Sequence, residues 1–102
     1  MAELVTVARV EDVPEGTVKV VEAGGRRIAL CNYQGTIYAI DDVCTHDGGA
    51  LDQGELFDYE VECPRHGARF DVRTGEVTCL PAVEPVKSYA VQTDNGEIAV
   101  EV

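Results

Sequence analysis

The amino-acid sequence predicts an all-β fold, either an antiparallel sandwich or a small open barrel. Short runs rich in β-branched and aromatic residues recur along the chain, and several alternate apolar with polar side chains, as half-buried strands do. Turn sequences that contain glycine separate these runs. No window of about twelve residues keeps the 3.6-residue apolar period of an amphipathic helix, so almost no helix is expected.

The expected strands follow one another along the chain, with turns between them. The strands are predicted at residues 3–10, 17–23, 26–32, 36–40, 59–63, 68–72, 86–93 and 97–102. The turns are predicted at residues 14–16, 23–25, 33–35, 73–75 and 94–96. Asp94-Asn95-Gly96 is a strong hairpin signal, because Asn-Gly tolerates the positive φ angles of a type I′ turn.

The length of 102 residues predicts one domain that spans residues 1–102. Residues 41–82 differ from their flanks, since they hold both histidines, three of the four cysteines and two of the four prolines. We therefore expect a β base formed by residues 1–40 and 83–102, with an inserted part at about 41–82 that carries the functional site.

Charge and targeting signals restrict the partners. The chain has 19 acidic and 8 basic residues and a net charge of −11, which argues against nucleic acid and favours a partner with a basic surface. Neither an export signal nor an apolar run of about 18 residues is present, so a cytoplasmic protein without a membrane partner is expected. In that setting, four cysteines favour metal binding or free thiols over disulfides.

Two short motifs pair each histidine with a cysteine. Cys44 and His46 lie in "CTHDGG", and Cys63 and His66 lie in "CPRHGA". Spacings of two and three residues can each direct two ligands to one point, and the nearby glycines let the backbone pass close to a bound group. Two thiolates and two imidazoles suit a tetrahedral zinc ion or an iron–sulfur cluster of mixed ligation. Zinc pairs usually read C-x2-4-C and H-x3-5-H, so the alternating order disfavours zinc, which stays an alternative.

The two motifs, C-T-H-x-G and C-P-x-H-G, resemble the cluster-binding loops of Rieske iron–sulfur proteins. Most of the chain is similar to the small Rieske ferredoxins of bacterial aromatic-ring dioxygenase systems, including "EDVPEG", "GTIYAIDDVCTH", "CPRHGARFDVRTGEV" and the segment from Leu80 to the C-terminus. The resemblance implies a Rieske-like β-sandwich with an inserted cluster-binding subdomain. It also implies that Cys44 and Cys63 bind one iron of a [2Fe–2S] cluster and that His46 and His66 bind the other.

The same resemblance implies a one-electron carrier and not an enzyme. Such a carrier delivers electrons from a flavin-dependent ferredoxin reductase to a terminal aromatic-ring oxygenase, and both partners are expected to have basic docking surfaces. Two alternatives stay open: a small electron-transfer subunit of another redox enzyme, such as assimilatory nitrite reductase, and a zinc-stabilised binding module.

Departures from the quinol-oxidising Rieske proteins predict a low reduction potential. Those relatives have an extra cysteine in each loop, which form a disulfide, and a Ser and a Tyr that donate hydrogen bonds to the cluster. The corresponding positions here hold Gly49, Arg65, Ala68 and Phe70. Since hydrogen bonds to the sulfurs stabilise the reduced cluster, we expect a potential near the lower end of the roughly −150 to +300 mV range of Rieske centres.

The remaining predictions concern residues near the site. Cys31 is expected to share a strand face with Ala29 as a buried free thiol. The resemblance implies that Pro81 lies in a third loop that covers the cluster, and Cys79 is expected next to this loop. Leu51 and Leu80 are expected to shield the cluster from water. The nearby carboxylates form either a solvated face or a field that steers basic partners; they are Asp41, Asp42, Asp47, Asp52, Glu55, Asp58, Glu60 and Glu62. Arg65 and Arg69 are expected to fix the docking orientation.

Overall fold

The computed structural model describes residues 3–45, 48–65 and 67–102. The predictions made for His46, Asp47 and His66 lie outside these residues. The strands are β1 (Leu4–Arg9), β2 (Val18–Ala23), β3 (Arg26–Tyr33), β4 (Thr36–Asp41), β5 (Leu56–Phe57), β6 (Glu60–Glu62), β7 (Arg69–Asp71), β8 (Val77–Cys79), β9 (Ser88–Tyr89), β10 (Val91–Asp94) and β11 (Glu97–Glu101). Two 3₁₀ turns, η1 (Val10–Asp12) and η2 (Leu51–Gln53), are the helical segments in the described ranges.

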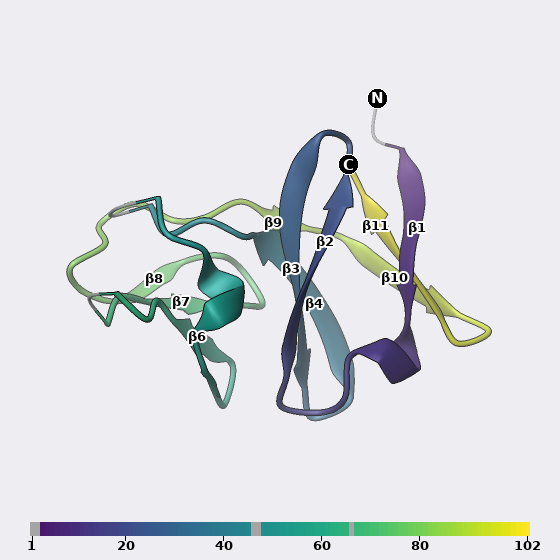
Figure 1. Ribbon diagram of the computed structural model, residues 1–102, viewed down its shortest axis with the longest axis horizontal. Helices are drawn as coiled ribbons and strands as arrows, with labels where there is room; N and C mark the ends of the chain where they lie inside the picture. Colours follow the sequence, from purple (N-terminus) through teal and green to yellow (C-terminus); the bar gives the residue numbers. More distant parts are fainter. Residues whose placement is uncertain (1–2, 46–47, 66) are drawn as a thin grey trace.

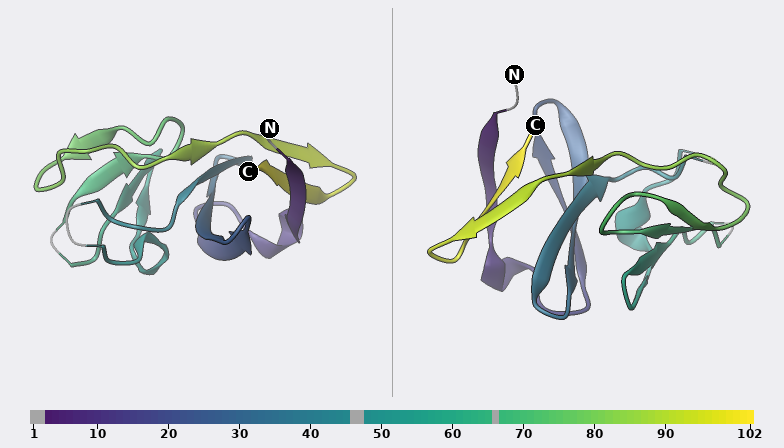
Figure 2. Two further views of the ribbon diagram at one scale, coloured as in Figure 1. Left: turned by 90° about the horizontal axis from the view of Figure 1, so that it is seen from above. Right: turned by 180° about the vertical axis from the view of Figure 1, so that it is seen from behind.

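The strands form three antiparallel sheets. Their orders are β1-β11-β10, β2-β3-β4-β9 and β5-β6-β7-β8. The first two sheets pack together as the base of the molecule, and the third stands beside them at the other end of the long axis (Figure 1). The two further views show the same separation (Figure 2), and the molecule measures 38 × 29 × 18 Å. The predicted all-β antiparallel fold is confirmed.

The β10–β11 hairpin has the turn that its sequence predicts. Asn95 and Gly96 have φ angles of 52° and 77°, which are the positive values that a type I′ turn requires. Asp94 pairs with Glu97 across this turn. The turn sets the register of the hairpin and places Ile98 and Val100 in the core of the base.

Strand β3 is buried on both faces and divides two hydrophobic cores. Ile28 and Leu30 belong to the core between the first two sheets, whereas Ala29 and Cys31 belong to the core that faces the third sheet. Successive side chains of a strand point to opposite faces, so one strand serves both cores. Cys31 shares its face with Ala29 and is a buried free thiol, as predicted.

The structure differs from the predicted strands in three places. Strands β5 and β8 were not predicted, because they are two and three residues long and are not part of a longer β-rich run. The predicted strand at 86–93 is divided into β9, which pairs with β4, and β10, which pairs with β11. The chain thus passes from the second sheet to the first near Ala90. The local pattern of apolar residues does not reveal such a passage, because it does not show which strands pair in space.

Candidate cofactor site

Two loops at the end of the molecule that carries the third sheet have the same pattern of backbone hydrogen bonds. In the first loop, residues 44–49, the N–H of Cys44 donates a hydrogen bond to the carbonyl oxygen of Gly49 (2.7 Å). The N–H of Gly48 donates to the carbonyl oxygen of Cys44 (2.7 Å). In the second loop, residues 63–68, the N–H of Cys63 donates to the carbonyl oxygen of Ala68 (2.7 Å), and the N–H of Gly67 donates to the carbonyl oxygen of Cys63 (3.0 Å). Each cysteine therefore occupies the same position in its loop.

Each loop closes on a glycine four residues after the cysteine. Gly48 and Gly67 have φ angles of +76° and +80°, in the left-handed region that other residues adopt only at a cost. Apart from the two chain neighbours of each glycine, no heavy atom of the described residues lies within 4 Å of the position that a Cβ atom would take at Gly48 or Gly67. The glycines are therefore needed for the backbone conformation and not because neighbouring atoms crowd them.

The structure brings the two predicted thiolate ligands into one core. Cys44 follows β4, and Cys63 lies in the loop between β6 and β7. Both are 1% exposed and belong to the core that also contains Leu51, Ala68 and Phe70. Leu51 is buried, as its predicted shielding role requires.

A third loop, residues 80–86 between β8 and β9, meets the first loop. The hydroxyl of Thr45 donates to the carbonyl oxygen of Glu84 (2.7 Å), and Ala82 and Val86 are buried in the core of the two cysteines. The three loops gather at one end of the molecule, on the left in Figure 1. Leu80, in contrast, is 70% exposed, so it does not pack into this core.

The described donor set fits half of a mixed-ligand cluster. Two buried thiols on matching loops are what a Cys2His2 iron–sulfur site needs from its cysteines. The two predicted histidine ligands lie outside the described residues, and within the described ranges no group of three or more ligand-type side chains is found. The complete ligand set therefore stays a prediction.

The other two cysteines have different surroundings. Burial raises the pKa of the Cys31 thiol to about 12, with a smaller contribution from the charge of Asp42. Cys31 therefore stays a protonated thiol at neutral pH. Cys79, at the end of β8, is exposed.

Asp42, two residues before Cys44, connects the segment before the first loop to two other parts of the chain by hydrogen bonds. Its buried carboxylate accepts hydrogen bonds from the backbone N–H of Asp52 (2.7 Å) and from Nη2 of Arg27 (3.2 Å). Burial raises the pKa of Asp42, and the side chain of Asp52 raises it further. The sequence did not single out this link, because its partners lie ten and fifteen residues away.

Several of the carboxylates predicted to surround the site are bound within the protein. Asp41 accepts hydrogen bonds from the hydroxyl of Tyr89 and from Arg26 (3.4 Å). Arg69 donates to Glu62 (3.0 Å) and lies 3.8 Å from the carboxylate of Glu60. These pairs offset part of the local negative charge, and they hold the side chain of Arg69 within the third sheet.

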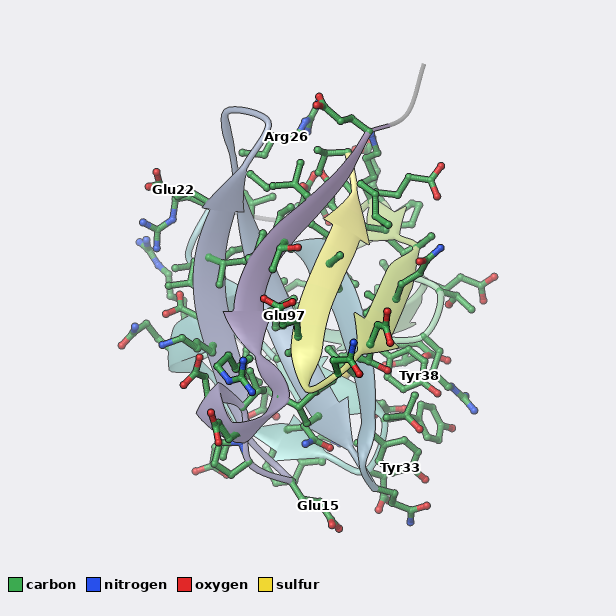
Figure 3. All side chains as sticks on the ribbon, turned by 90° about the vertical axis from the view of Figure 1, so that its right-hand side faces the viewer. Glu15, Glu22, Arg26, Tyr33, Tyr38 and Glu97 are labelled. Atoms are coloured by element: carbon green, nitrogen blue, oxygen red, sulfur yellow. The ribbon has the colours of Figure 1, made fainter. Side chains whose placement is uncertain are left out.

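Other acidic side chains remain at the surface. Glu55, Asp58 and Glu76 are exposed in the part of the chain that carries the third sheet. Glu15, Glu22 and Glu97 project from the base end of the molecule (Figure 3). The negative charge therefore extends over both ends. No helix in the described ranges is long and apolar enough to cross a membrane.

Comparisons with known proteins agree with this geometry. Residues 3–90 match the Rieske [2Fe-2S] domain family. The ferredoxin component of the naphthalene 1,2-dioxygenase/salicylate 5-hydroxylase systems of Ralstonia sp. is 39% identical over 97 residues, which cover 95% of this chain and 93% of that protein.

Two solved structures have the same fold. The ferredoxin of carbazole 1,9a-dioxygenase from Nocardioides aromaticivorans IC177 is 37% identical, with a TM-score of 0.92 and 95% of each chain covered. A chain in a complex of reduced oxygenase and oxidized ferredoxin in carbazole 1,9a-dioxygenase is 32% identical, with a TM-score of 0.90, and the match covers 95% of this chain and 91% of that one.

The domain match, the relatives and the two matching loops lead to one assignment. The chain belongs to the Rieske [2Fe-2S] domain family, and it is an electron carrier of the ferredoxin type whose cofactor is a [2Fe–2S] cluster.

Proposed function

We propose that this ferredoxin carries single electrons from a flavin-dependent ferredoxin reductase to a terminal aromatic-ring oxygenase. The observation that carries the proposal is the match with a dioxygenase ferredoxin component over nearly the full length of both chains. The solved complex of a related ferredoxin with its oxygenase supports the second partner. The aromatic substrate is chosen by the oxygenase, so this chain does not determine it.

Four residues are proposed to hold the cluster. Cys44 and Cys63 would bind one iron, and His46 and His66 would bind the other. The bound cluster supplies a reversible one-electron change of iron valence. The protein fixes the two cysteines through the matching loop hydrogen bonds and surrounds them with apolar side chains such as Leu51 and Phe70, which exclude water.

We further propose that one domain divides this work between two parts. Residues 1–40 and 83–102 would form a supporting β base, and residues of about 41–82 would form the cluster-binding part. The separate third sheet supports this division. The double burial of β3 joins the two parts into one folding unit.

The acidic surface is proposed to speed encounters with basic surfaces on both partners. A net charge of −11 and exposed carboxylates such as Glu55, Asp58 and Glu76 would produce the long-range attraction. The carboxylates that are paired with arginines contribute less to this field. The encounter rate should therefore fall as salt is added, since exposed charges are screened.

Reconstitution with purified components tests the proposal. The holoprotein would replace the native ferredoxin in the naphthalene dioxygenase and carbazole dioxygenase systems, each with its own reductase and oxygenase. We expect product formation that depends on the added ferredoxin and is lost with the Cys63→Ser variant. If the reductases reduce the protein but neither oxygenase receives electrons from it, the assignment to aromatic-ring oxygenases is wrong.

A further inference from the structure

The most exposed large apolar side chains of the described residues lie on the third loop. Leu80 and Val83 are 70% and 78% exposed, and Leu4, Val43 and Phe57 are exposed to a smaller extent. Two such side chains on one short loop keep apolar surface in contact with water, which is unfavourable unless a partner covers them.

The protein holds the third loop in place, so the exposure of Leu80 and Val83 is not that of a loose end. Between and after them, Ala82 and Val86 are buried in the core that contains both site cysteines. The N–H of Val86 donates to the carbonyl oxygen of Gly75 (2.9 Å). Because the inward-facing residues anchor the backbone, Leu80 and Val83 need little further ordering when a partner binds.

The position of the loop places this apolar pair beside the cofactor. Thr45, the residue after Cys44, is hydrogen-bonded to Glu84 of the same loop. All three loops lie at the end of the molecule remote from the β1–β11–β10 sheet (Figures 1 and 2). A protein seated on Leu80 and Val83 would therefore contact the part of the ferredoxin that carries the cluster.

The charged side chains next to Leu80 and Val83 are of both signs. Glu84 and Lys87 are exposed on and just after the loop and carry opposite charges. On the neighbouring segment, Asp41 is paired with Arg26. The contact surface should therefore be apolar and close to neutral, even though the chain as a whole is strongly acidic.

We propose that Leu80 and Val83 form the apolar contact on which the terminal oxygenase docks. This inference rests on the proposed function, and it names the residues that hold the complex after electrostatic encounter. The occupant is the oxygenase because a related ferredoxin, 32% identical to this chain, has been solved in complex with its oxygenase. The part of the oxygenase that faces Leu80 and Val83 would be apolar, whereas its basic surface would act in the earlier electrostatic encounter.

A double variant, Leu80→Asn/Val83→Asn, tests the contact in whichever dioxygenase system the wild-type holoprotein supports. With the reductase in excess, the KM of the oxygenase for the ferredoxin should rise about tenfold, since two apolar side chains lose their burial in the complex. The ratio of variant to wild-type KM should stay constant from about 50 to about 500 mM NaCl, because an apolar contact is not screened. The visible spectrum and the reduction potential should not change.

Leu4→Asn is the matched control. Leu4 is 47% exposed on β1, in the sheet remote from the three loops, and its substitution should leave the KM unchanged. An unchanged KM in the double variant, with a working wild-type protein, overturns this inference and leaves the proposed function intact. A wild-type holoprotein that the reductases reduce but that supports no turnover in either system overturns the proposed function and the inference with it.

Discussion

The side-chain hydroxyl of Thr45 donates a hydrogen bond to the backbone carbonyl oxygen of Glu84, at 2.7 Å and across 39 residues of sequence. This bond joins the first cysteine loop to the third loop. It is a direct polar link between the residue that follows Cys44 and the loop that exposes Leu80 and Val83.

Replacing Thr45 with valine should loosen the third loop. The change keeps the side-chain shape and removes the donor, so we expect a loss of about 1 kcal/mol in the free energy of unfolding and a decrease of about 5 °C in the Tm of the holoprotein. Thr45→Ser keeps the hydroxyl and should retain most of the stability. Equal Tm values for the valine and serine variants would contradict this role of the bond.

Removal of any proposed ligand should abolish the cluster. Cys44→Ser, Cys63→Ser, His46→Ala and His66→Ala should each lose the visible absorption of the [2Fe–2S] centre, because in each variant one of the two irons would lack one of its two protein ligands. Cys31→Ser and Cys79→Ser are matched controls and should keep the spectrum and the iron content. A histidine variant with an unchanged spectrum and EPR signal would remove that residue from the ligand set.

One thiol of the native holoprotein should react with a disulfide reagent at pH 8. Cys79 is exposed, whereas Cys31 is buried and burial raises its pKa to about 12, so only a minute fraction of Cys31 is thiolate at that pH. We expect Ellman's reagent to titrate about one thiol per chain, since cluster-bound cysteines are protected. Cys79→Ser should abolish the fast reaction, and a fast reaction that persists in this variant would contradict the assignment.

A hydroxyl placed near the cluster should raise its reduction potential. Phe70 is fully buried with Cys44 and Cys63, at the position where the resemblance implies a tyrosine in quinol-oxidising relatives. Phe70→Tyr should raise the potential by roughly 40 mV if the added hydrogen bond favours the reduced state by about 1 kcal/mol. Protein-film voltammetry measures this change, and a potential that stays constant or falls would refute the argument.

The Asp71–Arg73 pair should stabilise the fold at neutral pH and lose its effect in acid. Burial raises the pKa of Asp71, but hydrogen bonds from the side chain and backbone of Arg73 outweigh that effect and lower the pKa overall. A lowered folded-state pKa gives stability that is present above the unfolded value of about 3.9 and disappears as the pH falls through the folded value. Asp71→Asn should therefore lower the Tm at pH 7, and its difference from wild type should shrink towards pH 3. A difference that is the same at both pH values would show that the carboxylate's charge is not the cause.

The sequence predicted those features that depend on neighbouring residues. Alternation placed Cys31 with Ala29 on one face of a strand, and Asn-Gly predicted the turn before Ile98. The transfer between sheets near Ala90 depends on which strands meet in space, so no local pattern reveals it. The same holds for the link between Asp42 and Arg27, and for the exposure of Leu80, whose apolar side chain the sequence had assigned to shielding the cluster.

Strand β3 sends Ile28 and Leu30 into the core of the base, and it sends Ala29 and Cys31 into the core of the cysteine loops. Neighbouring positions along one strand therefore affect different parts of the molecule. Changes at Ala29 or Cys31 can adjust the packing behind the cofactor while the scaffold keeps its own interior, and changes at Ile28 or Leu30 can do the opposite. Substitutions at every second residue of this one strand can therefore change the surroundings of the redox centre without altering the interior of the base.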